Sequence, residues 1–283
     1  MNILLIGRTG QLGLELARTL EPLGELRATV RSTLDLADSA AVATALRQAK
    51  PQVIVNAAAY TAVDKAESEP ELALQVNGVA PGVMAEEAKR LGALLVHYST
   101  DYVFNGRKSS PYLEDDAVDP LNVYGRSKLE GELRIRASGC RHVIVRSAWV
   151  YGRGSNFVRA ILRQAEKGGP LRVVNDQFGA PTWAADIAEV TATLFHLTGT
   201  FHVTAAGKAS WYEVAREVLR LMGHSAEVRP VSSDEYGASA PRPRYSVLDN
   251  GRLLAAGVTP IADWRERLEA HLDQLKSGNH GIH

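Results

Sequence analysis

Short apolar runs alternate with amphipathic stretches over the first half of the chain. Glycine, proline or polar residues bound each run, and helix-like segments lie between consecutive runs. Strands that alternate with helices in this way predict right-handed βαβ units and a parallel sheet. We expect strands at residues 3–6, 26–30, 53–56, 94–98 and 143–145, and helices at 12–23, 39–49, 69–92 (with a bend at Pro81) and 122–138.

The strict alternation loosens after about residue 150. Residues 232–244 are rich in serine, proline and alanine, which predicts a long loop of the kind that often covers a site. The polar residues after Lys276 predict a disordered tail. We expect further strands at 171–175, 201–204 and 227–231, and further helices at 184–197, 210–222 and 263–276. The pattern therefore predicts an α/β protein with a Rossmann-type doubly wound parallel sheet and a smaller C-terminal α/β lobe.

Length, charge and cysteine content narrow the class of protein. A chain of 283 residues with 45% hydrophobic content can form one large domain or a main domain with a smaller lobe. Lysine plus arginine equals aspartate plus glutamate at 32 each, so no overall field favours nucleic acid or an anionic membrane. The single cysteine, Cys140, excludes an internal disulfide and a cysteine-rich metal site.

Neither targeting nor metal-binding signals stand out. The N-terminus lacks a basic segment, and no stretch approaches the ~20 apolar residues that span a bilayer. The eight histidines show no metal-ligand spacing, so we predict no metal site from them, and His280 and His283 are expected to be exposed. We therefore expect a soluble, cytoplasmic protein.

Three glycines follow the first apolar run and open the first helix. Gly7 would allow a tight turn, Gly10 a close approach of the backbone to a pyrophosphate, and Gly13 close packing of helix on strand. The N–H groups at the helix start would then face the anion. The alternative is a purely structural glycine turn, but the strand–loop–helix context favours an NAD(P)-binding domain at residues 1–150, to which later segments return. Residues 151–283 would then form mainly a substrate-binding lobe.

The residue after the second predicted strand bears on cofactor choice. Arg31 stands where an acidic side chain would ordinarily bind the adenosine ribose, and no carboxylate is available there. A guanidinium suits a 2′-phosphate, so NADPH is favoured, with NADH left open; the alternative is a solvated arginine. Asp35 and Leu36 follow, where they would hold the adenine, although Asp35 could equally be a turn residue.

Tyr124 and Lys128 provide the candidate chemistry. They lie four residues apart in a predicted helix and so project from one face. An ammonium group near a phenol favours the phenolate, so we expect Lys128 to lower the pKa of Tyr124 and to make it a usable acid or base. The alternative is an ordinary pair on a helix surface.

Four further segments carry a family resemblance. They are 56–67 (NAAAYTAVDKAE), 99–106 (STDYVFNG), 120–131 (PLNVYGRSKLEG) and 175–182 (NDQFGAPT). With these in order, the chain closely resembles the dTDP-4-dehydrorhamnose reductase family of extended short-chain dehydrogenase/reductases. The resemblance implies NAD(P)H-dependent reduction of the C4 ketone of dTDP-4-dehydro-β-L-rhamnose to dTDP-β-L-rhamnose. This is the last step in making activated L-rhamnose, a precursor of polysaccharide and lipopolysaccharide.

The resemblance also implies residue roles. Tyr124 would donate the proton, Lys128 would assist it, and Thr100 would take the place of the third catalytic residue. Thr100, Asp101 and Trp149 would contact the sugar nucleotide. The implied cofactor contacts are Gly10, Gln11, Leu12, Asp35, Leu36, Ala59, Tyr60 and Thr61.

Several questions stay open at this point. Arg242 would either clamp the substrate diphosphate or be solvated, and Arg244–Tyr245 departs from the family's usual residues. Glu15 matches a magnesium ligand of some relatives, but one carboxylate at a helix start is poor support for Mg²⁺. Rival functions are a related nucleotide-sugar 4-ketoreductase, an epimerase, or a regulatory subunit that binds a cofactor without turnover. The oligomeric state is also open, with a homodimer as the candidate.

Overall fold

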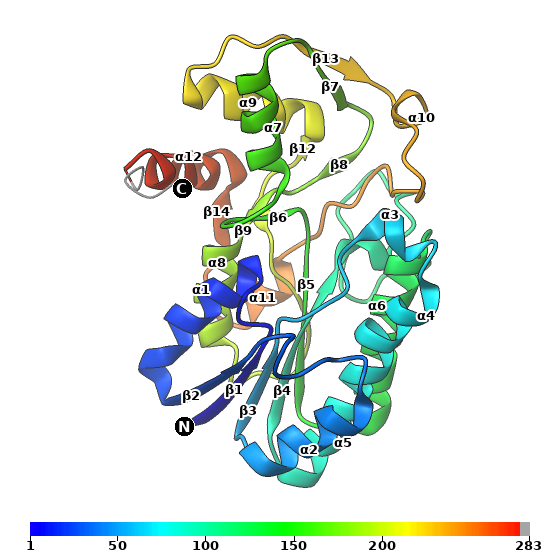
Figure 1. Cartoon of the computed structure of the whole chain (residues 1–283), viewed down its shortest axis with the longest axis vertical. Coiled ribbons are helices and arrows are strands. Elements are labelled where there is room, and N and C mark those ends of the chain that lie inside the picture. The colour runs from blue at the N-terminus through cyan, green and yellow to red at the C-terminus, as the bar shows by residue number, and fades with distance from the viewer. Residues whose placement is uncertain (278–283) are drawn as a thin grey trace.

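A six-stranded parallel sheet organises the protein, and the computed structural model describes residues 1–277 (Figure 1). The strand order is β10-β5-β4-β3-β1-β2, and every neighbouring pair is parallel. The fold predicted from the apolar runs is therefore confirmed. The strands are β1 (Asn2–Ile6), β2 (Glu25–Thr29), β3 (Val53–Asn56), β4 (Leu94–Thr100), β5 (His142–Ser147) and β10 (Gly199–His202).

Helices cover both faces of this sheet. Helices α1 (Gln11–Leu20) and α8 (Ala184–Thr193) pack on one face, whereas α2 (Ser39–Ala49), α5 (Ala80–Leu91) and α6 (Val123–Ser138) pack on the other. Strand β1 shows how the sequence serves both layers, because its side chains alternate between the two faces. Ile3 and Leu5 join the core beneath α1 and α8, and Leu4 and Ile6 join the core beneath α2 and α5.

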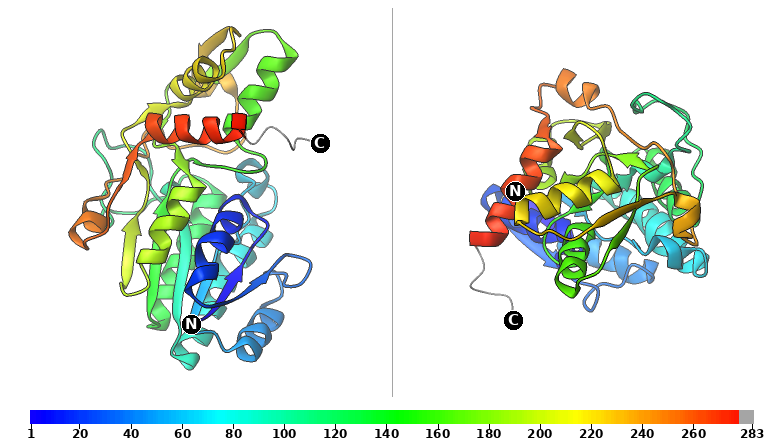
Figure 2. Two further views of the ribbon diagram at one scale, coloured as in Figure 1. Left: turned by 90° about the vertical axis from the view of Figure 1, so that its left-hand side faces the viewer. Right: turned by 90° about the horizontal axis from the view of Figure 1, so that it is seen from above.

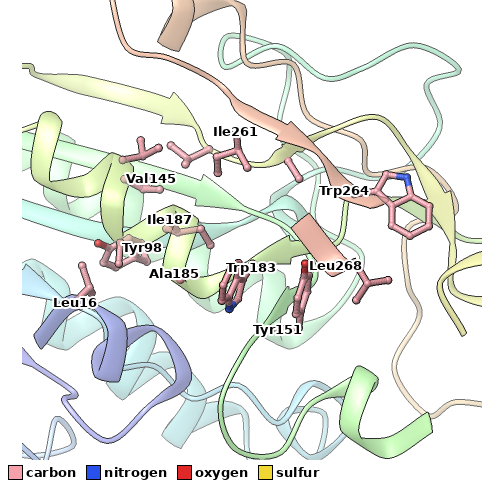
Figure 3. Close-up of a cluster of buried hydrophobic side chains, with 14 of the residues drawn as sticks. Leu16, Tyr98, Val145, Tyr151, Trp183, Ala185, Ile187, Ile261, Trp264 and Leu268 are labelled. Atoms are coloured by element: carbon pink, nitrogen blue, oxygen red, sulfur yellow. The ribbon is translucent and has the colours of Figure 1, made fainter. Parts of the chain in front are cut away.

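The larger core extends beyond the sheet into the C-terminal part of the chain. Figure 3 shows Leu16 and Val145 in the same cluster as Trp183, Trp264 and Leu268. Trp264 and Leu268 belong to α12 (Trp264–Ser277), which follows β14 (Ile261–Asp263). Each fully buried leucine or isoleucine contributes about 1.5–3 kcal/mol, so this shared core fixes α12 against the sheet layer.

A second group of elements lies beyond the carboxyl ends of the strands, and we call it the C-terminal lobe (Figures 1 and 2). It pairs β7 with β13 and β8 with β12, and packs α7 against α9. Nearby, β6 pairs with β9 and β11 with β14. The bounds are β6 (Val150–Tyr151), α7 (Phe157–Lys167), β7 (Leu171–Val174), β8 (Phe178–Gly179), β9 (Thr182–Trp183), β11 (Ala205–Ala206), β12 (Ala209–Ser210), α9 (Trp211–Met222), β13 (Val228–Val231) and α10 (Ser233–Tyr236).

Two predicted elements differ from the structure. The helix expected at 69–92 is divided into α4 (Pro70–Leu74), a π-helical segment η2 (Gln75–Val79) and α5, so the irregularity precedes Pro81. The loop expected at 232–244 contains α10, because Ser232 and Glu235 form a reciprocal capping box. The remaining short elements are η1 (Glu21–Leu23), α3 (Val63–Ala66), η3 (Asp101–Val103) and α11 (Gly251–Ala255).

The C-terminal tail and membrane-spanning potential complete the description. The tail expected to be disordered, with His280 and His283, falls at 278–283, outside the described residues. Over residues 1–277, no helix has the length and apolar character needed to cross a bilayer.

Candidate active site

A cavity of about 590 Å³ opens at the carboxyl ends of β1, β2, β3 and β4. Ligands of open α/β sheets bind at this edge. The predicted cofactor residues gather here from four separate stretches of the chain. Those on its wall are Gly7, Gly10, Gln11, Leu12, Arg31, Asp35, Leu36, Ala59, Tyr60, Thr61, Tyr124 and Lys128.

The glycine loop has the close contacts that a phosphate cradle requires. Gly7 has a φ of +92°, and a side chain on it would meet the backbone of Ala58 at 2.7 Å. A Cβ on Gly13 would lie 2.0 Å from the carbonyl oxygen of Gly7, which explains why Gly13 supports the loop from beneath. Helix α1 begins at Gln11 without a side-chain cap or an acidic residue in its first turn. Its first N–H groups are therefore suited to a pyrophosphate, so this cavity fits a dinucleotide, and we call it the dinucleotide cavity.

Arg31 and Asp35 both line this cavity. The Arg31 side chain is 81% exposed, and its Nε lies 4.0 Å from a carboxylate oxygen of Asp35. The other carboxylate oxygen of Asp35 accepts a hydrogen bond from the N–H of Ala37, as a turn residue would. Arg31 is thus free to reach a phosphate group at the cavity mouth.

The start of α6 places Tyr124 beside Thr100. Asn122 caps the helix by accepting from the N–H of Gly125, and its side-chain amide donates to the carbonyl of Pro241. A Cβ on Gly125 would lie 2.3 Å from the carbonyl oxygen of Tyr102, so only glycine allows this approach of α6 to η3. As a result, the half-buried Tyr124 side chain lies with its hydroxyl near that of Thr100.

Lys128 does not act on Tyr124 in the way that we expected. Burial raises the pKa of Tyr124 to about 12, and only the hydroxyl of Thr100 lowers it. The expectation of a lowered pKa is therefore wrong for the protein without cofactor. The Lys128 Nζ points elsewhere: it donates to the carbonyl of Tyr98 at 2.6 Å and lies 3.3 Å from Nε2 of His97. Burial lowers the pKa of Lys128 to about 8, although Glu132 raises it in part.

Asp101 is a buried carboxyl group next to the proposed proton donor. One of its oxygens accepts from the hydroxyl of Thr100 at 3.0 Å. Burial raises the pKa of Asp101 to about 6, despite the lowering effect of the nearby Ser246 and Thr100 hydroxyls. The residue therefore remains mostly ionised at neutral pH and favours a neutral phenol, rather than a phenolate, at Tyr124.

A second cavity, of about 720 Å³, lies between α7, β7 and the segment 233–244. Arg242 lies on its wall and is not solvated: its guanidinium forms an ion pair with Asp64 at 2.6 Å, and its side chain is 19% exposed. Asp64 also accepts from the hydroxyl of Ser239 and the N–H of Ala240. Arg172 and Arg244 line the same cavity, which suits it to an anionic ligand.

Tyr102 lies between the two cavities. Its ring meets the ring of Tyr124 edge-on at 5.7 Å, and its hydroxyl lies near the guanidinium of Arg242. Trp149, the other predicted substrate contact, has a φ of +48° and stacks on Trp211 at 3.5 Å between ring centroids. Trp211 lines the second cavity, so Trp149 supports that wall from behind.

Whether Glu15 could help to bind Mg²⁺ depends on the residues around it. Its buried carboxylate lies 3.3 Å from Arg153 and 3.5 Å from Arg18. Two guanidinium groups already neutralise it, so these residues do not fit Mg²⁺. Within residues 1–277, no group of three histidine, cysteine or acidic side chains is placed to hold a metal ion.

Parallel sheet, glycine loop and buried tyrosine–lysine pair together define an enzyme of the short-chain dehydrogenase/reductase type, which binds a nicotinamide cofactor. The family model of the RmlD substrate binding domain matches residues 1–277, and the chain belongs to this family, that of the dTDP-4-dehydrorhamnose reductases.

Similar proteins match this chain over almost its whole length. The spore coat polysaccharide biosynthesis protein SpsK of Bacillus subtilis (strain 168) is 43% identical, with 98% of each chain covered. The dTDP-4-dehydrorhamnose reductase of Burkholderia thailandensis is also 43% identical, over 94% of this chain and 96% of that protein. A solved dTDP-4-dehydrorhamnose reductase from Bacillus anthracis, in complex with NADP, has a TM-score of 0.93 at 35% identity and covers 96% of this chain and 98% of its own.

Sequence reasoning missed three residues that the structure places at the site. His97 contacts Lys128, Tyr102 connects the two cavities, and Asp64 anchors Arg242. His97 carried one usable signal, because a polar residue inside a fully buried strand needs a partner. The Asp64–Arg242 pair had none, since 178 residues separate its members.

Proposed function

We propose that this protein reduces the C4 ketone of dTDP-4-dehydro-β-L-rhamnose to dTDP-β-L-rhamnose, with NADPH as the reductant. The observation that carries the proposal is the place of Tyr124. Its hydroxyl lies near that of Thr100, its side chain lines the dinucleotide cavity, and its ring contacts Tyr102, a neighbour of Arg242 on the wall of the second cavity. A ketone held there would meet both the proton donor and the cofactor.

The state of Tyr124 favours reduction over oxidation. When bound, the reduced nicotinamide supplies a hydride to the carbonyl carbon. The pKa of about 12 keeps Tyr124 protonated at neutral pH, so it can donate to the oxygen as negative charge develops there. Thr100 orients the same oxygen through its hydroxyl. An epimerase must first remove a proton from a hydroxyl group, which calls for a phenolate that this site disfavours.

The substrate would extend from Tyr124 into the second cavity. Asp101 and Thr100 would contact the sugar, and Arg242 would bind the diphosphate bidentately while Asp64 holds it in place. Trp149 would act on the nucleotide mainly by supporting Trp211. Arg31, exposed at the other end, would bind the 2′-phosphate and so favour NADPH over NADH. The division at residue 150, the cytoplasmic location and the homodimer stay predictions from the sequence.

A substrate panel tests the function and its rivals. We expect loss of NADPH absorbance with dTDP-4-dehydrorhamnose, with slower turnover of UDP-linked and other 4-keto-6-deoxysugars, and dTDP-β-L-rhamnose as the product by NMR. A regulatory subunit would bind NADPH without consuming it. An epimerase would purify with bound NAD and would need no added reductant.

Replacing Tyr124 with phenylalanine tests the proton donor itself. We expect kcat to fall by about 10²–10⁴-fold, the usual contribution of a positioned general acid, while the Kd of NADPH stays unchanged. Stopped-flow kinetics and fluorescence titration measure the two quantities. Tyr212→Phe, at a partly exposed tyrosine of α9 outside the linings of the two cavities described above, is the matched control. Equal turnover in the Tyr124 variant and the parent would contradict the role.

A further inference from the structure

A row of buried polar side chains, linked by hydrogen-bond distances, leads from the end of β3 to Lys128. The N–H of Ala58 donates to Oδ1 of Asn56 at 3.2 Å. Nδ2 of Asn56 lies 3.1 Å from Nδ1 of His97, and Nε2 of His97 lies 3.3 Å from Nζ of Lys128. Nζ donates onward to the carbonyl of Tyr98. Asn56, His97 and Lys128 are each at least 98% buried, so they depend mainly on one another and on nearby backbone groups for hydrogen-bond partners.

The backbone fixes the orientation of the Asn56 amide. An N–H group can only donate, so the side-chain atom that faces Ala58 must be the oxygen. If the amide were flipped, its NH₂ group would face the N–H of Ala58, and two donors would meet in a buried position. Asn56 therefore presents its NH₂ group to His97.

The tautomer of His97 follows from that orientation. A donor at 3.1 Å requires a lone pair on Nδ1, and a neutral imidazole with a lone pair on Nδ1 carries its proton on Nε2. His97 is neutral because burial holds its pKa well below the usual range. It therefore points an N–H group at Nζ of Lys128.

An N–H group facing Nζ is met best by a lone pair, which only the uncharged amine of lysine possesses. An ammonium group there would place two donors against each other at 3.3 Å. We propose that Asn56 and His97 act together as a tautomer lock, which favours the neutral amine of Lys128 in the enzyme without cofactor. The hydrogen bond from Nζ to the carbonyl of Tyr98 is compatible with this state, because a neutral amine still donates two protons.

Other groups near Lys128 act in both directions. Glu132, one turn further along α6, favours the ammonium, but its carboxylate is already bound by Arg146 at 2.7 Å and by Arg136 at 2.7 Å. Tyr124, also on α6, is a neutral phenol. On β4, the side chain of Tyr98 is likewise a neutral phenol. Asn56 and His97 thus favour the neutral amine of Lys128, as burial does, whereas Glu132 favours the ammonium.

The consequence concerns cofactor binding. The hydroxyl groups of a nicotinamide ribose can accept hydrogen bonds, so they would favour the ammonium form that the lock disfavours. NADPH affinity should then fall as pH rises through the pKa of Lys128, which is about 8. This step rests on the proposed function only in placing the nicotinamide ribose at Lys128. The tautomer itself does not depend on any activity.

The first experiment reads the tautomer directly. ¹⁵N NMR of the full chain labelled at histidine, with His97→Gln used to assign the signal, should show a proton on Nε2 and none on Nδ1. In Asn56→Asp, a carboxylate oxygen replaces the NH₂ group and accepts from His97, so the proton should move to Nδ1. A native protein with the proton on Nδ1 would overturn the proposal, whether or not the enzyme turns over its substrate.

The second experiment follows the lysine. Asn56→Asp makes His97 an acceptor, and His97→Gln offers Lys128 an amide oxygen. Both should shift the alkaline fall of NADPH affinity, and of kcat/KM, to higher pH by about one unit, the scale of one reversed hydrogen bond.

Two control variants separate this effect from a general one. Gln52→Glu adds the same charge as Asn56→Asp at an exposed position before β3, and His196→Gln repeats the other change at an exposed site. A residue with a merely structural role would change stability or kcat without moving the curve. Shifts no larger than those of the controls, or shifts to lower pH, would refute the lock; if one variant does not fold, the other and the native tautomer decide.

Discussion

The dinucleotide cavity and the second cavity are built in opposite ways. Backbone and small side chains shape the glycine-loop side of the dinucleotide cavity, where Gly7 against Ala58 and Gly13 against Gly7 leave no room for a Cβ. Side chains from distant segments, apolar as well as charged, shape the second, and Asp64 and Arg242 pair on its wall across 178 residues of sequence. The difference teaches that the cofactor loop of this chain is encoded by a short local sequence, whereas the second cavity depends on contacts between residues far apart in the chain.

A backbone-built cavity should fail sharply when a single Cβ is added. In Gly13→Val, the side chain would collide with the carbonyl of Gly7, so we expect the Kd of NADPH to rise by about 100-fold or more, because overpacking a tight site forces the backbone to shift. Gly82→Val is the matched control, since it adds the same side chain to a helix outside the cavity, where the Cβ would meet only the flexible side chain of Arg134. Fluorescence titration measures both. Similar losses in the two variants would mean that the loop is not held by the contact at Gly13.

A cavity formed by side chains should lose affinity for its ligand only gradually when one side chain is changed. Asp64→Asn removes the charge that pairs with Arg242, and we expect the KM for the sugar nucleotide to rise about tenfold while the Kd of NADPH stays constant, since a partly exposed ion pair is worth a modest energy. Because the hydrogen bond from Arg242 lowers the pKa of Asp64 to about 2, the carboxylate stays charged through any practical assay range. Asp234→Asn, at an exposed acid of the same cavity, is the control. A fall in KM would mean that Asp64 competes with the diphosphate for Arg242.

The smallest effect should come from the solvent-exposed end of the dinucleotide cavity. Arg31→Ala should raise the Kd of NADPH about fivefold and that of NADH little, because a charge-assisted contact with a 2′-phosphate is partly screened at an exposed site. Arg27→Ala, on β2 and paired with Glu25, changes the same residue type away from the cavity. Equal weakening of both cofactors would assign Arg31 to the surface.

Much of the fold was predictable because each strand is a compact apolar run. β3 was predicted to the residue, and the other five strands of the sheet to within two residues at either end. The short helix α10 was missed because serine and glutamate residues read as loop until their reciprocal capping is seen. The π-helical turns of η2 were also missed, since no local pattern distinguishes them from α-helix.

The sequence predicted which residues form the candidate site, but not the directions in which their side chains point. The sequence pattern placed Tyr124 and Lys128 on one helix face, yet it could not show that Nζ reaches back to β4 and contacts Tyr98 and His97. That direction depends on which buried strand lies under α6. Trp149 was likewise identified, but its stacking on Trp211 depends on a helix 62 residues away in sequence.

Strand β10 has a consequence for how the chain can be divided. It forms one border of the central sheet beside β5, although its residues come between β9 and β11 in the chain order. A fragment that stops near residue 150 would leave the N–H and C=O groups of β5 without their neighbour and would present an open sheet margin prone to self-association. The polypeptide must therefore be synthesised past Gly199–His202 before the nucleotide-binding half can close, and neither half is a natural unit for separate expression or domain exchange.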